Sequence, residues 1–267
     1  AETLFGECDP GGRLPFTWPH CEGQLPLYYN YKPSGRAYDY IDMVATPLFP
    51  FGYGLSYTKF KYSNLKIKSN EDGWKISVDI ENIGDRRGYE VVQLYIRDVV
   101  ASIARPFKEL RGFSKIMLEP GEKKTVTFTL TPDDLAMFDS RMRRIVEPGE
   151  FEILIGRSSE DILVKGKIVV DKLIKGRFKC SLDREVGEVK RGEQFKITAV
   201  IENIGQISDL IPIELLVDGK ILERHRIDLA VREKRKIGFK LKFTEPGEHR
   251  ITLRLPEESS SLAIYVR

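Results

Sequence analysis

The sequence predicts a mainly β protein in which an irregular segment precedes two antiparallel β-sandwiches in tandem. From about Tyr57 onward, apolar and polar residues alternate with a period of two, which is the pattern of half-buried strands. Short strands of this kind, separated by turn sequences, are typical of sandwiches. The plan of these strands recurs later in the chain, whereas residues 1–57 lack it. We therefore expect three segments: 1–57, 58–171 and 174–267.

Residues 1–57 differ in composition from everything that follows. They hold 7 of the 14 prolines, 7 of the 22 glycines and 7 of the 11 tyrosines. So short a segment, this rich in Pro and Gly, buries too little apolar surface to fold alone, and we expect it to pack against another body. Residues 1–6 read as the end of a helix that begins upstream. Residues 51–55 have glycines at GxG spacing, but no helix pattern follows, so a tight turn is favoured over a dinucleotide site.

The strands of the 58–171 segment follow from alternation and from short apolar runs. Residues 74–81 and 126–130 alternate, and further apolar runs cover 91–96, 151–155 and 162–170. A separate paired-acid motif follows the second of these strands. Asp133 and Asp134 come directly after Thr-Pro, which marks a helix start, so helix capping is favoured over catalysis for this pair.

The second sandwich is predicted from an internal repeat. Residues 79–84 (Asp-Ile-Glu-Asn-Ile-Gly) are echoed by residues 200–205 (Val-Ile-Glu-Asn-Ile-Gly), in each case at the end of an alternating strand. The Glu-Lys-Lys and Glu-Pro-Gly-Glu sequences of the first copy also return in order as Glu-Lys-Arg and Glu-Pro-Gly-Glu. Repetition of several landmarks in one order indicates two related domains.

Charge and hydropathy exclude several classes of protein. The 267 residues include 43 Lys and Arg against 40 Asp and Glu, a net charge of +3 that argues against disorder and against nucleic acid as the main partner. No stretch approaches the roughly 18 apolar residues of a membrane helix, and no basic, apolar leader opens the chain. Residues 172–267 hold 20 of the basic and 15 of the acidic residues. Their densest basic run, 232–236, is interpreted as a solvated hairpin turn rather than an anionic-polymer contact.

Cysteine and histidine usage favours no catalytic, metal or cofactor site. The three cysteines are too few for a disulfide framework and have no zinc spacing. Cys8 and Cys21 flank a Pro/Gly-rich loop and could pair, although three free thiols are the favoured interpretation. The three histidines lie in separate regions without a Ser or Cys motif beside them. We predict no cofactor, no metal ligand and no catalytic residue in this chain.

One cluster of aromatic and charged residues is a candidate contact site. Aromatic faces cover the apolar faces of sugars, while charged groups bind hydroxyls. Tyr and Arg are equally enriched where a loop packs on a neighbouring domain or subunit, and this second interpretation is favoured. Beside Lys32 and Asp39, the cluster comprises Tyr28, Tyr29, Tyr31, Arg36, Tyr38 and Tyr40.

Several motifs, in one order, resemble the C-terminal part of glycoside hydrolase family 3, the β-glucosidase and β-xylosidase group. The resemblance covers about residues 3–170. It rests on Leu4-Phe5-Gly6, on residues 10–15 (Pro-Gly-Gly-Arg-Leu-Pro), on 47–57 (Pro-Leu-Phe-Pro-Phe-Gly-Tyr-Gly-Leu-Ser-Tyr), on 91–95 (Val-Val-Gln-Leu-Tyr) and on 105–113. It implies that residues 1–57 are the C-terminal remnant of an α/β sandwich domain and that residues 58–171 are fibronectin type III-like. Residues 174–267 resemble Ig-like adhesion modules, a weaker likeness.

The resemblance also implies a role. Family members are retaining enzymes that use an Asp nucleophile on a TIM-type barrel and an acid/base Glu, and no position here matches either motif. The chain alone is therefore expected to be inactive and to brace catalytic domains that lie upstream or on a separate chain. Glycans and a second copy of the chain are further candidate partners. The alternative is a stand-alone carbohydrate-binding or adhesion module without enzymatic activity.

Overall fold

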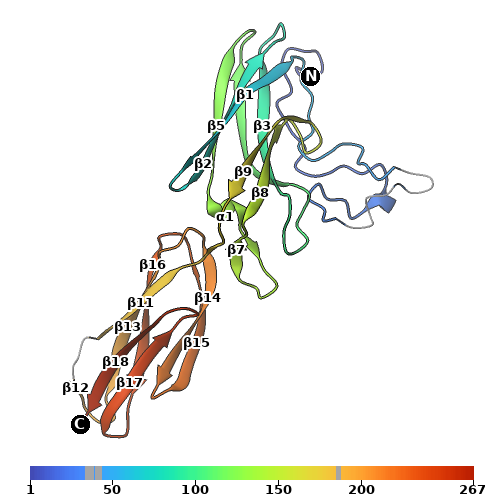
Figure 1. The fold of residues 1–267 in the computed structure, drawn as a ribbon. Coiled ribbons are helices and arrows are strands. Elements are labelled where there is room, and N and C mark those ends of the chain that lie inside the picture. Colours follow the sequence, from blue (N-terminus) through green and yellow to red (C-terminus); the bar gives the residue numbers. More distant parts are fainter. Residues whose placement is uncertain (34–38, 40–43, 185–187) are drawn as a thin grey trace. The chain divides into compact units, whose positions relative to one another are not determined.

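The computed structural model describes residues 1–33, 39, 44–184 and 188–267, and these divide into two compact units (Figure 1). The first unit comprises Ala1–Leu135 with Glu147–Lys172, and the second comprises Ala136–Val146 with Leu173–Arg267. The fold is mainly β, as predicted. Residues 136–146, which lie inside the 58–171 segment of the sequence analysis, group with the second unit. In the described part of the chain, no helix is long and apolar enough to cross a membrane.

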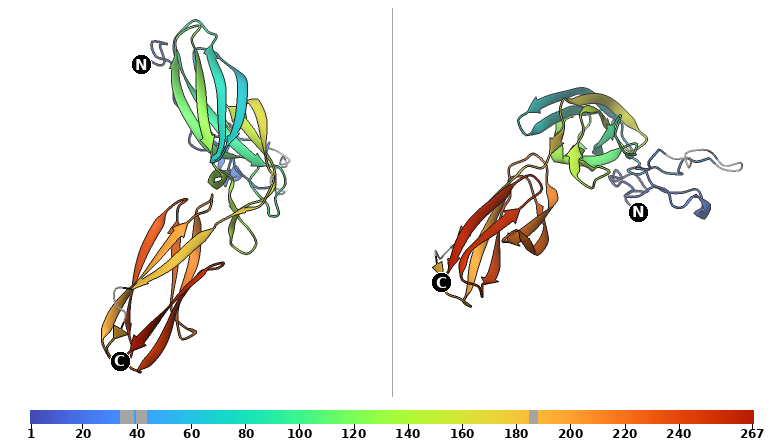
Figure 2. Two further views of the ribbon diagram at one scale, coloured as in Figure 1. Left: turned by 60° about the vertical axis from the view of Figure 1, so that its left-hand side comes forward. Right: turned by 60° about the horizontal axis from the view of Figure 1, so that its bottom comes forward.

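The first unit contains a sandwich of a three-stranded sheet, in the order β1-β2-β5, and a four-stranded sheet, in the order β4-β3-β8-β9 (Figures 1 and 2). Its inward positions are those that the alternation marks: Ile76, Val78 and Ile80 are fully buried. The strands are β1 (Phe60–Asn70), β2 (Gly73–Asn82), β3 (Gly88–Asp98), β4 (Glu109–Leu118), β5 (Lys123–Leu130), β8 (Gly149–Gly156) and β9 (Ile162–Val170).

Residues 1–57 are here called the arm; those of them that the structure describes form an irregular trace with one 3-10 turn, η1 (Glu22–Gln24) (Figure 1). The arm begins with the hydrogen-bond pattern of a helix C-terminus. The N–H of Glu7 donates to the carbonyl of Glu2 (2.9 Å), the N–H of Gly6 donates to the carbonyl of Thr3 (3.3 Å), and Gly6 has a φ of 80°. These are the two bonds and the left-handed glycine of a Schellman motif.

After β5 the chain forms a short helix, α1 (Pro132–Leu135). The carboxylate of Asp134 accepts hydrogen bonds from the backbone N–H of Thr131 (2.7 Å) and from its hydroxyl (2.8 Å). This is the reciprocal contact of a capping box, in which the third helical residue reaches back to the cap. The capping role predicted for this acidic pair is therefore confirmed for Asp134.

The second unit repeats the sandwich with a three-stranded sheet, in the order β11-β13-β16, and a five-stranded sheet, in the order β12-β18-β17-β14-β15. A further small sheet, in the order β10-β7-β6, precedes it. The strands are β6 (Met137–Phe138), β7 (Arg144–Val146), β10 (Ile174–Lys175), β11 (Phe178–Arg184), β12 (Glu188–Val189), β13 (Gln194–Asn203), β14 (Asp209–Val217), β15 (Lys220–Leu229), β16 (Lys234–Lys242), β17 (Gly247–Arg254) and β18 (Ser259–Val266).

The two sandwiches share one pairing register. In the first, Asp79 lies opposite Thr125 and Glu81 lies opposite Lys123. In the second, the repeat positions Val200 and Glu202 lie opposite Lys236 and Lys234. Each landmark of the sequence repeat therefore occupies the same place in its own sheet.

The shared Glu-Asn-Ile-Gly sequence has a structural purpose beyond a turn. Asn82 and Asn203 are both fully buried. The amide nitrogen of Asn82 donates to the carbonyls of Arg86 (2.8 Å) and Leu118 (3.0 Å), and its oxygen accepts from the N–H of Gly84 (3.1 Å). Asn203 makes the same three bonds, at 2.9 to 3.1 Å, to the equivalent groups of Ile207, Leu229 and Gly205. Each Asn thus satisfies three backbone groups that the strand ladder leaves open.

Candidate functional site

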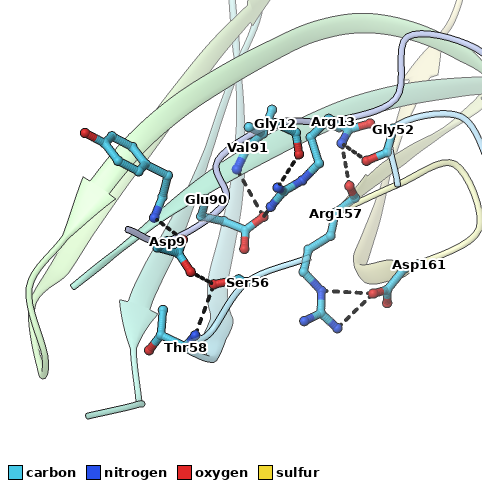
Figure 3. A network of polar contacts seen from close by, with 12 residues as sticks. Asp9, Gly12, Arg13, Gly52, Ser56, Thr58, Glu90, Val91, Arg157 and Asp161 are labelled. Carbon is cyan, nitrogen blue, oxygen red and sulfur yellow. Dashed lines mark hydrogen bonds and ion pairs between the residues drawn. The ribbon is translucent and has the colours of Figure 1, made fainter. Parts of the chain in front are cut away.

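The arm is fastened to the first sandwich by a network of polar contacts, here called the junction (Figure 3). Asp9 is its first anchor. One carboxylate oxygen accepts from the hydroxyl of Ser56 (2.8 Å) and the N–H of Tyr57 (2.7 Å), and the other accepts from the N–H of Tyr89 (2.9 Å). A single side chain therefore holds the start of the arm, its end and the first residues of β3 together.

A buried ion pair is the second anchor. Arg13 donates to Glu90 at 3.2 Å, and the two side chains are only 9% and 1% exposed. The same carboxylate accepts from the N–H of Val91 (3.1 Å). Burial raises the pKa of Glu90 above its usual range, and the neighbouring Arg13 guanidinium opposes that rise. Removing either partner would leave the other buried without its counter-charge, which is strongly destabilising.

Gln93 on β3 is the third anchor, and it explains one glycine of the arm. Its amide donates to the carbonyls of Gly52 (3.1 Å) and Arg157, and its oxygen accepts from the hydroxyl of Tyr95 (2.5 Å). Gly52 has a φ of 81°, and a Cβ there would collide with the Gln93 amide. The turn predicted at residues 51–55 is therefore present, and it closes onto the side chain of Gln93.

An aromatic stack extends the junction along the outer face of β3. Tyr29 stacks on Phe51, with ring centroids 4.2 Å apart, and meets Tyr95 edge to face at 6.0 Å. The hydroxyl of Tyr29 accepts from the N–H of Leu110 at 3.2 Å. Of the predicted contact residues, Tyr29 is thus half-buried against the first sandwich, and it also lines a pocket beside Tyr28 and Tyr31.

Tyr28 and Tyr31 lie at a pocket of about 530 Å³ between the arm and the loop that joins β8 to β9. Tyr28 is 62% exposed, and Tyr31 is 43% exposed and packs edge-on against Phe107 with centroids 5.1 Å apart. Gln24 is buried and lines the pocket. Its amide donates to the carbonyls of Val44 and Thr46 and so links the first part of the arm to the last. The remaining predicted contact residues, Arg36, Tyr38 and Tyr40, lie outside the described residues.

The arm also presents large apolar side chains to solvent. Most exposed apolar residues of a protein stand alone, whereas a concentration of them marks a surface that another protein covers. The most exposed examples on the arm are Leu4 (85%), Phe5 (82%), Leu55 (65%), Tyr28 (62%) and Leu25 (60%).

The cysteines and several other titratable groups that the structure describes lie outside this junction. No disulfide bond joins any of the three cysteines, all of which the structure describes. Among the described residues, no group of three His, Cys, Asp or Glu side chains could hold a metal ion. Asp218 and His249 form a close pair in the second unit, with the Nδ1 of His249 2.7 Å from the carboxylate. The other partners of this pair are backbone groups. Asp218 accepts from the N–H of Arg250 (2.8 Å), and the Nε2 of His249 lies 3.1 Å from the carbonyl of Glu245.

Sequence reasoning found the glycine turn but missed Asp9, Arg13, Glu90 and Gln93. The missed signal is the pattern of β3. Residues 90–96 are buried without interruption, which requires cover on both faces, and two polar residues, Glu90 and Gln93, stand in this run. A buried polar residue in a two-sided strand needs a partner, and the Pro/Gly-rich arm supplies it.

Two family descriptions match the chain. The glycosyl hydrolase family 3 C-terminal domain matches residues 1–57, and the fibronectin type III-like domain matches residues 90–159. A putative β-xylosidase from Formosa agariphila is 46% identical over 166 residues, or 60% of this chain and 22% of the relative. Thermostable β-glucosidase B from Acetivibrio thermocellus is 42% identical over 205 residues, or 71% of this chain and 27% of the relative.

Solved structures give the same result. A β-glucosidase from Erythrobacter marinus matches with a TM-score of 0.59 and 46% identity, over 63% of this chain and 23% of that one. A β-glucosidase from Listeria innocua in complex with glucose matches with a TM-score of 0.58 and 37% identity, over 64% and 26%. The chain spans about a quarter of the length of these relatives. Together these matches show that residues 1–57 and 90–159 match C-terminal domains of glycoside hydrolase family 3, and that the chain is similar to the C-terminal part of proteins of the β-glucosidase and β-xylosidase type.

Proposed function

We propose that this chain is the non-catalytic C-terminal part of a β-glucosidase-like glycoside hydrolase, and that it braces the catalytic domains of that enzyme. The hydrolysis of O-glycosyl bonds belongs to those domains. Support comes from the family matches of residues 1–57 and 90–159 and from the junction between them. A partner domain would dock on the arm, and the sandwich would hold the arm in place.

The arm itself is the observation on which this proposal depends. Its inner side is fixed by the buried Arg13–Glu90 pair and by Gln93, while Leu4, Phe5 and Leu55 point large apolar surface outward. A pre-ordered apolar surface loses little conformational entropy when a partner covers it. An irregular segment held this way is suited to structural docking.

The test is reconstitution with a catalytic portion. We would co-express this chain with β-glucosidase B of Acetivibrio thermocellus shortened to the residue that precedes the matching region. We expect the two chains to co-purify and hydrolysis of p-nitrophenyl β-glucoside to rise above that of either chain alone. Failure to associate, or association without any gain in activity, would contradict the bracing role.

Matched variants locate the contact. Leu4→Asp with Phe5→Asp changes two highly exposed side chains of the arm, so the fold should persist while co-purification is lost. Leu210→Asp with Leu222→Asp makes the same charge change at positions 50% and 53% exposed in the second unit, and should leave association unchanged. Equal loss in both pairs would place the contact elsewhere.

Tyr28 and Tyr31 are proposed as a contact at the pocket, with a sugar or with the docked partner. The two cases differ in their kinetics. If the rings touch a sugar, Tyr28→Ala with Tyr31→Ala should raise the KM of the reconstituted enzyme without changing how tightly the two chains associate. If the rings touch the partner, the same variant should weaken the association of the two chains. Unchanged KM and unchanged association would remove both roles.

A further inference from the structure

The second sandwich has one sheet face covered in lysine. On β11, β13 and β16, inward residues such as Ile197, Ile201 and Phe239 form the core, so the alternate residues point outward. Six of these outward residues are exposed or half-exposed lysines, and we call this surface the lysine face. Its lysines are Lys179, Lys196, Lys234, Lys236, Lys240 and Lys242.

Little on this face balances the positive charge. Glu202 lies between Lys179 and Lys234 in the pairing register, and its carboxylate is 3.7 Å from the ammonium of Lys234. The other outward acid, Asp183, lies opposite Thr198. Among the residues that the structure describes, none of the other five lysines forms an ion pair with an acidic side chain.

Two lysines stand directly against each other. Lys196 on β13 is the register partner of Lys240 on β16, and like charges in directly opposite positions destabilise a sheet. The side chain of Lys196 lies across Gly238, where an added Cβ would collide with its Cε. The face therefore holds repulsion that a bound anion would relieve.

Two other sheet faces can be compared with the lysine face. On β14, Glu214 pairs with both Arg224 (3.0 Å) and Arg254, so the opposite sheet of the same sandwich is internally balanced. In the first sandwich, the positions equivalent to Lys236 and Lys240 are Thr125 and Thr129 by the shared register. The equivalent outer face of the first sandwich carries five outward lysines of its own, with Lys68 directly opposite Lys75, and its Lys123 pairs with Asp79 at 3.1 Å. What distinguishes the lysine face is that Lys236 and Lys240 stand where that face has the two threonines.

We propose that the lysine face binds an anionic polysaccharide. The choice rests on the proposed function, because the rest of the chain resembles enzymes that act on carbohydrates. It also rests on composition: the outward positions of the three strands hold no aromatic ring and no Arg. Single-stranded nucleic acids bind through aromatic stacking, and base edges are read chiefly by Arg and by elements that enter a groove.

The geometry suits a repeating polyanion. Outward residues recur along a strand about every 6.6 Å, and neighbouring strands lie about 4.8 Å apart, so the ammonium groups form a two-dimensional array. Lys is a flexible point charge that can follow carboxylates or sulfates spaced along a chain without a fixed bidentate geometry. The hairpin turn expected at residues 232–236 is not formed, because β15 and β16 belong to different sheets. Residues 234–236 begin β16, and its lysines continue along the strand.

Binding of the full chain to polygalacturonate tests the proposal, with neutral laminarin as the uncharged comparison. We expect calorimetry at low salt to show binding to polygalacturonate that weakens as salt is added, and no competition by laminarin. Lys236→Thr with Lys240→Thr introduces the residues of the first sandwich at the same register, and should weaken binding roughly 3- to 30-fold. Lys165→Thr with Lys172→Thr removes the same charge from exposed positions of the first unit, on and after β9, and should leave affinity unchanged.

Three outcomes would overturn the proposal. The first is no binding to polygalacturonate at low salt. The second is equal loss of affinity in the two double variants, which would indicate net charge alone. The third is tighter binding to double-stranded DNA, or to phosphatidylglycerol vesicles, than to polygalacturonate. None of these measurements depends on hydrolysis, so the bracing role would stand or fall separately.

Discussion

Single buried residues fix the ends of strands in both sandwiches. Asn82 and Asn203 each donate to two carbonyls and accept from the N–H of a glycine two residues on. Asn82 also accepts from the hydroxyl of Thr58 at 2.7 Å. No shorter or apolar side chain offers two donors and an acceptor at one point, so these positions depend on the amide.

Replacing Asn82 should therefore be costly. Asn82→Ala leaves the carbonyls of Arg86 and Leu118 and the N–H of Gly84 buried without partners, and we expect a loss of about 3 kcal/mol in the free energy of unfolding. Urea unfolding followed by tryptophan fluorescence measures it. Asn70→Ala, at an exposed turn, should cost less than about 0.5 kcal/mol. Similar losses for the two variants would contradict this account.

His249 is the residue whose charge should matter near neutral pH. Its Nδ1 lies 2.7 Å from Asp218 and its Nε2 lies 3.1 Å from the carbonyl of Glu245. Both nitrogens face acceptors, which only the protonated ring can satisfy with two donors. The hydrogen bond to Asp218 is the main cause that raises the pKa of His249, and the same bond lowers the pKa of Asp218.

The sign of the pH effect follows from these directions. The contribution of His249 to stability is fully present below its unfolded pKa of about 6.5 and is lost as the pH rises through its higher folded pKa. The contribution of Asp218 is lost only in acid, below about pH 4. We expect the urea midpoint of the second unit, followed by circular dichroism, to fall between pH 6 and pH 8. His249→Gln should flatten this profile, whereas His225→Gln should retain it; a flat wild-type profile would refute the assignment.

At the scale of elements, β3 is the strand that organises the first unit. Leu94 on its inner face lies in the sandwich core. On its outer face, Gln93 donates to the carbonyl of Gly52 of the arm, and Tyr95 contacts the ring of Tyr29. A strand covered on both faces needs an arm that fits closely. The fit depends on glycine where the backbone and the strand approach each other.

Gly52 should tolerate no side chain. Gly52→Ala places a Cβ against the Gln93 amide at a φ of 81°, and we expect the arm to loosen, at a cost of about 2 kcal/mol. Gly12→Ala is the control, because nothing lies within 4 Å of an added Cβ there. Hydrogen exchange measured by mass spectrometry should rise across residues 1–57 in the first variant alone. Unchanged exchange in Gly52→Ala would show that this close approach does not hold the arm.

The strands could be predicted from the sequence because their signal is local. Alternation at residues 74–81 and 126–130 places side chains on two faces whatever surrounds the strand. The junction could not be predicted in the same way. Asp9 and Tyr89, or Arg13 and Glu90, are far apart in the chain, and no periodicity relates them. The pairing of β7 with β10 could not be predicted either, because a two-residue ladder leaves almost no pattern in the sequence.

At the scale of the molecule, each unit has its own core. Ile76 and Ile197 occupy the same repeat position, opposite Phe128 and Phe239, and both are fully buried. The two tryptophans of the chain, Trp18 and Trp74, both lie in the first unit. Fluorescence therefore reports the first unit alone, while circular dichroism reports the strands of both.

This arrangement gives a paired test of independent cores. Ile76→Ala should cost about 2 to 5 kcal/mol and shift the fluorescence midpoint in urea, because it leaves a cavity in the first core. Ile197→Ala should cost a similar amount but shift only part of the circular dichroism transition. A fluorescence shift of equal size in both variants would show that the two units unfold as one.

The shared register has a consequence for engineering. Inward residues and the buried Asn specify how each strand pair assembles, whereas the outward residues of β5 and β16 differ almost completely between the copies. The outward residues can thus be substituted without changing the inward residues and strand pairing that define the sandwich. Transplanting the outward residues of β13 and β16 onto β2 and β5 would give a chain that displays the same surface chemistry twice.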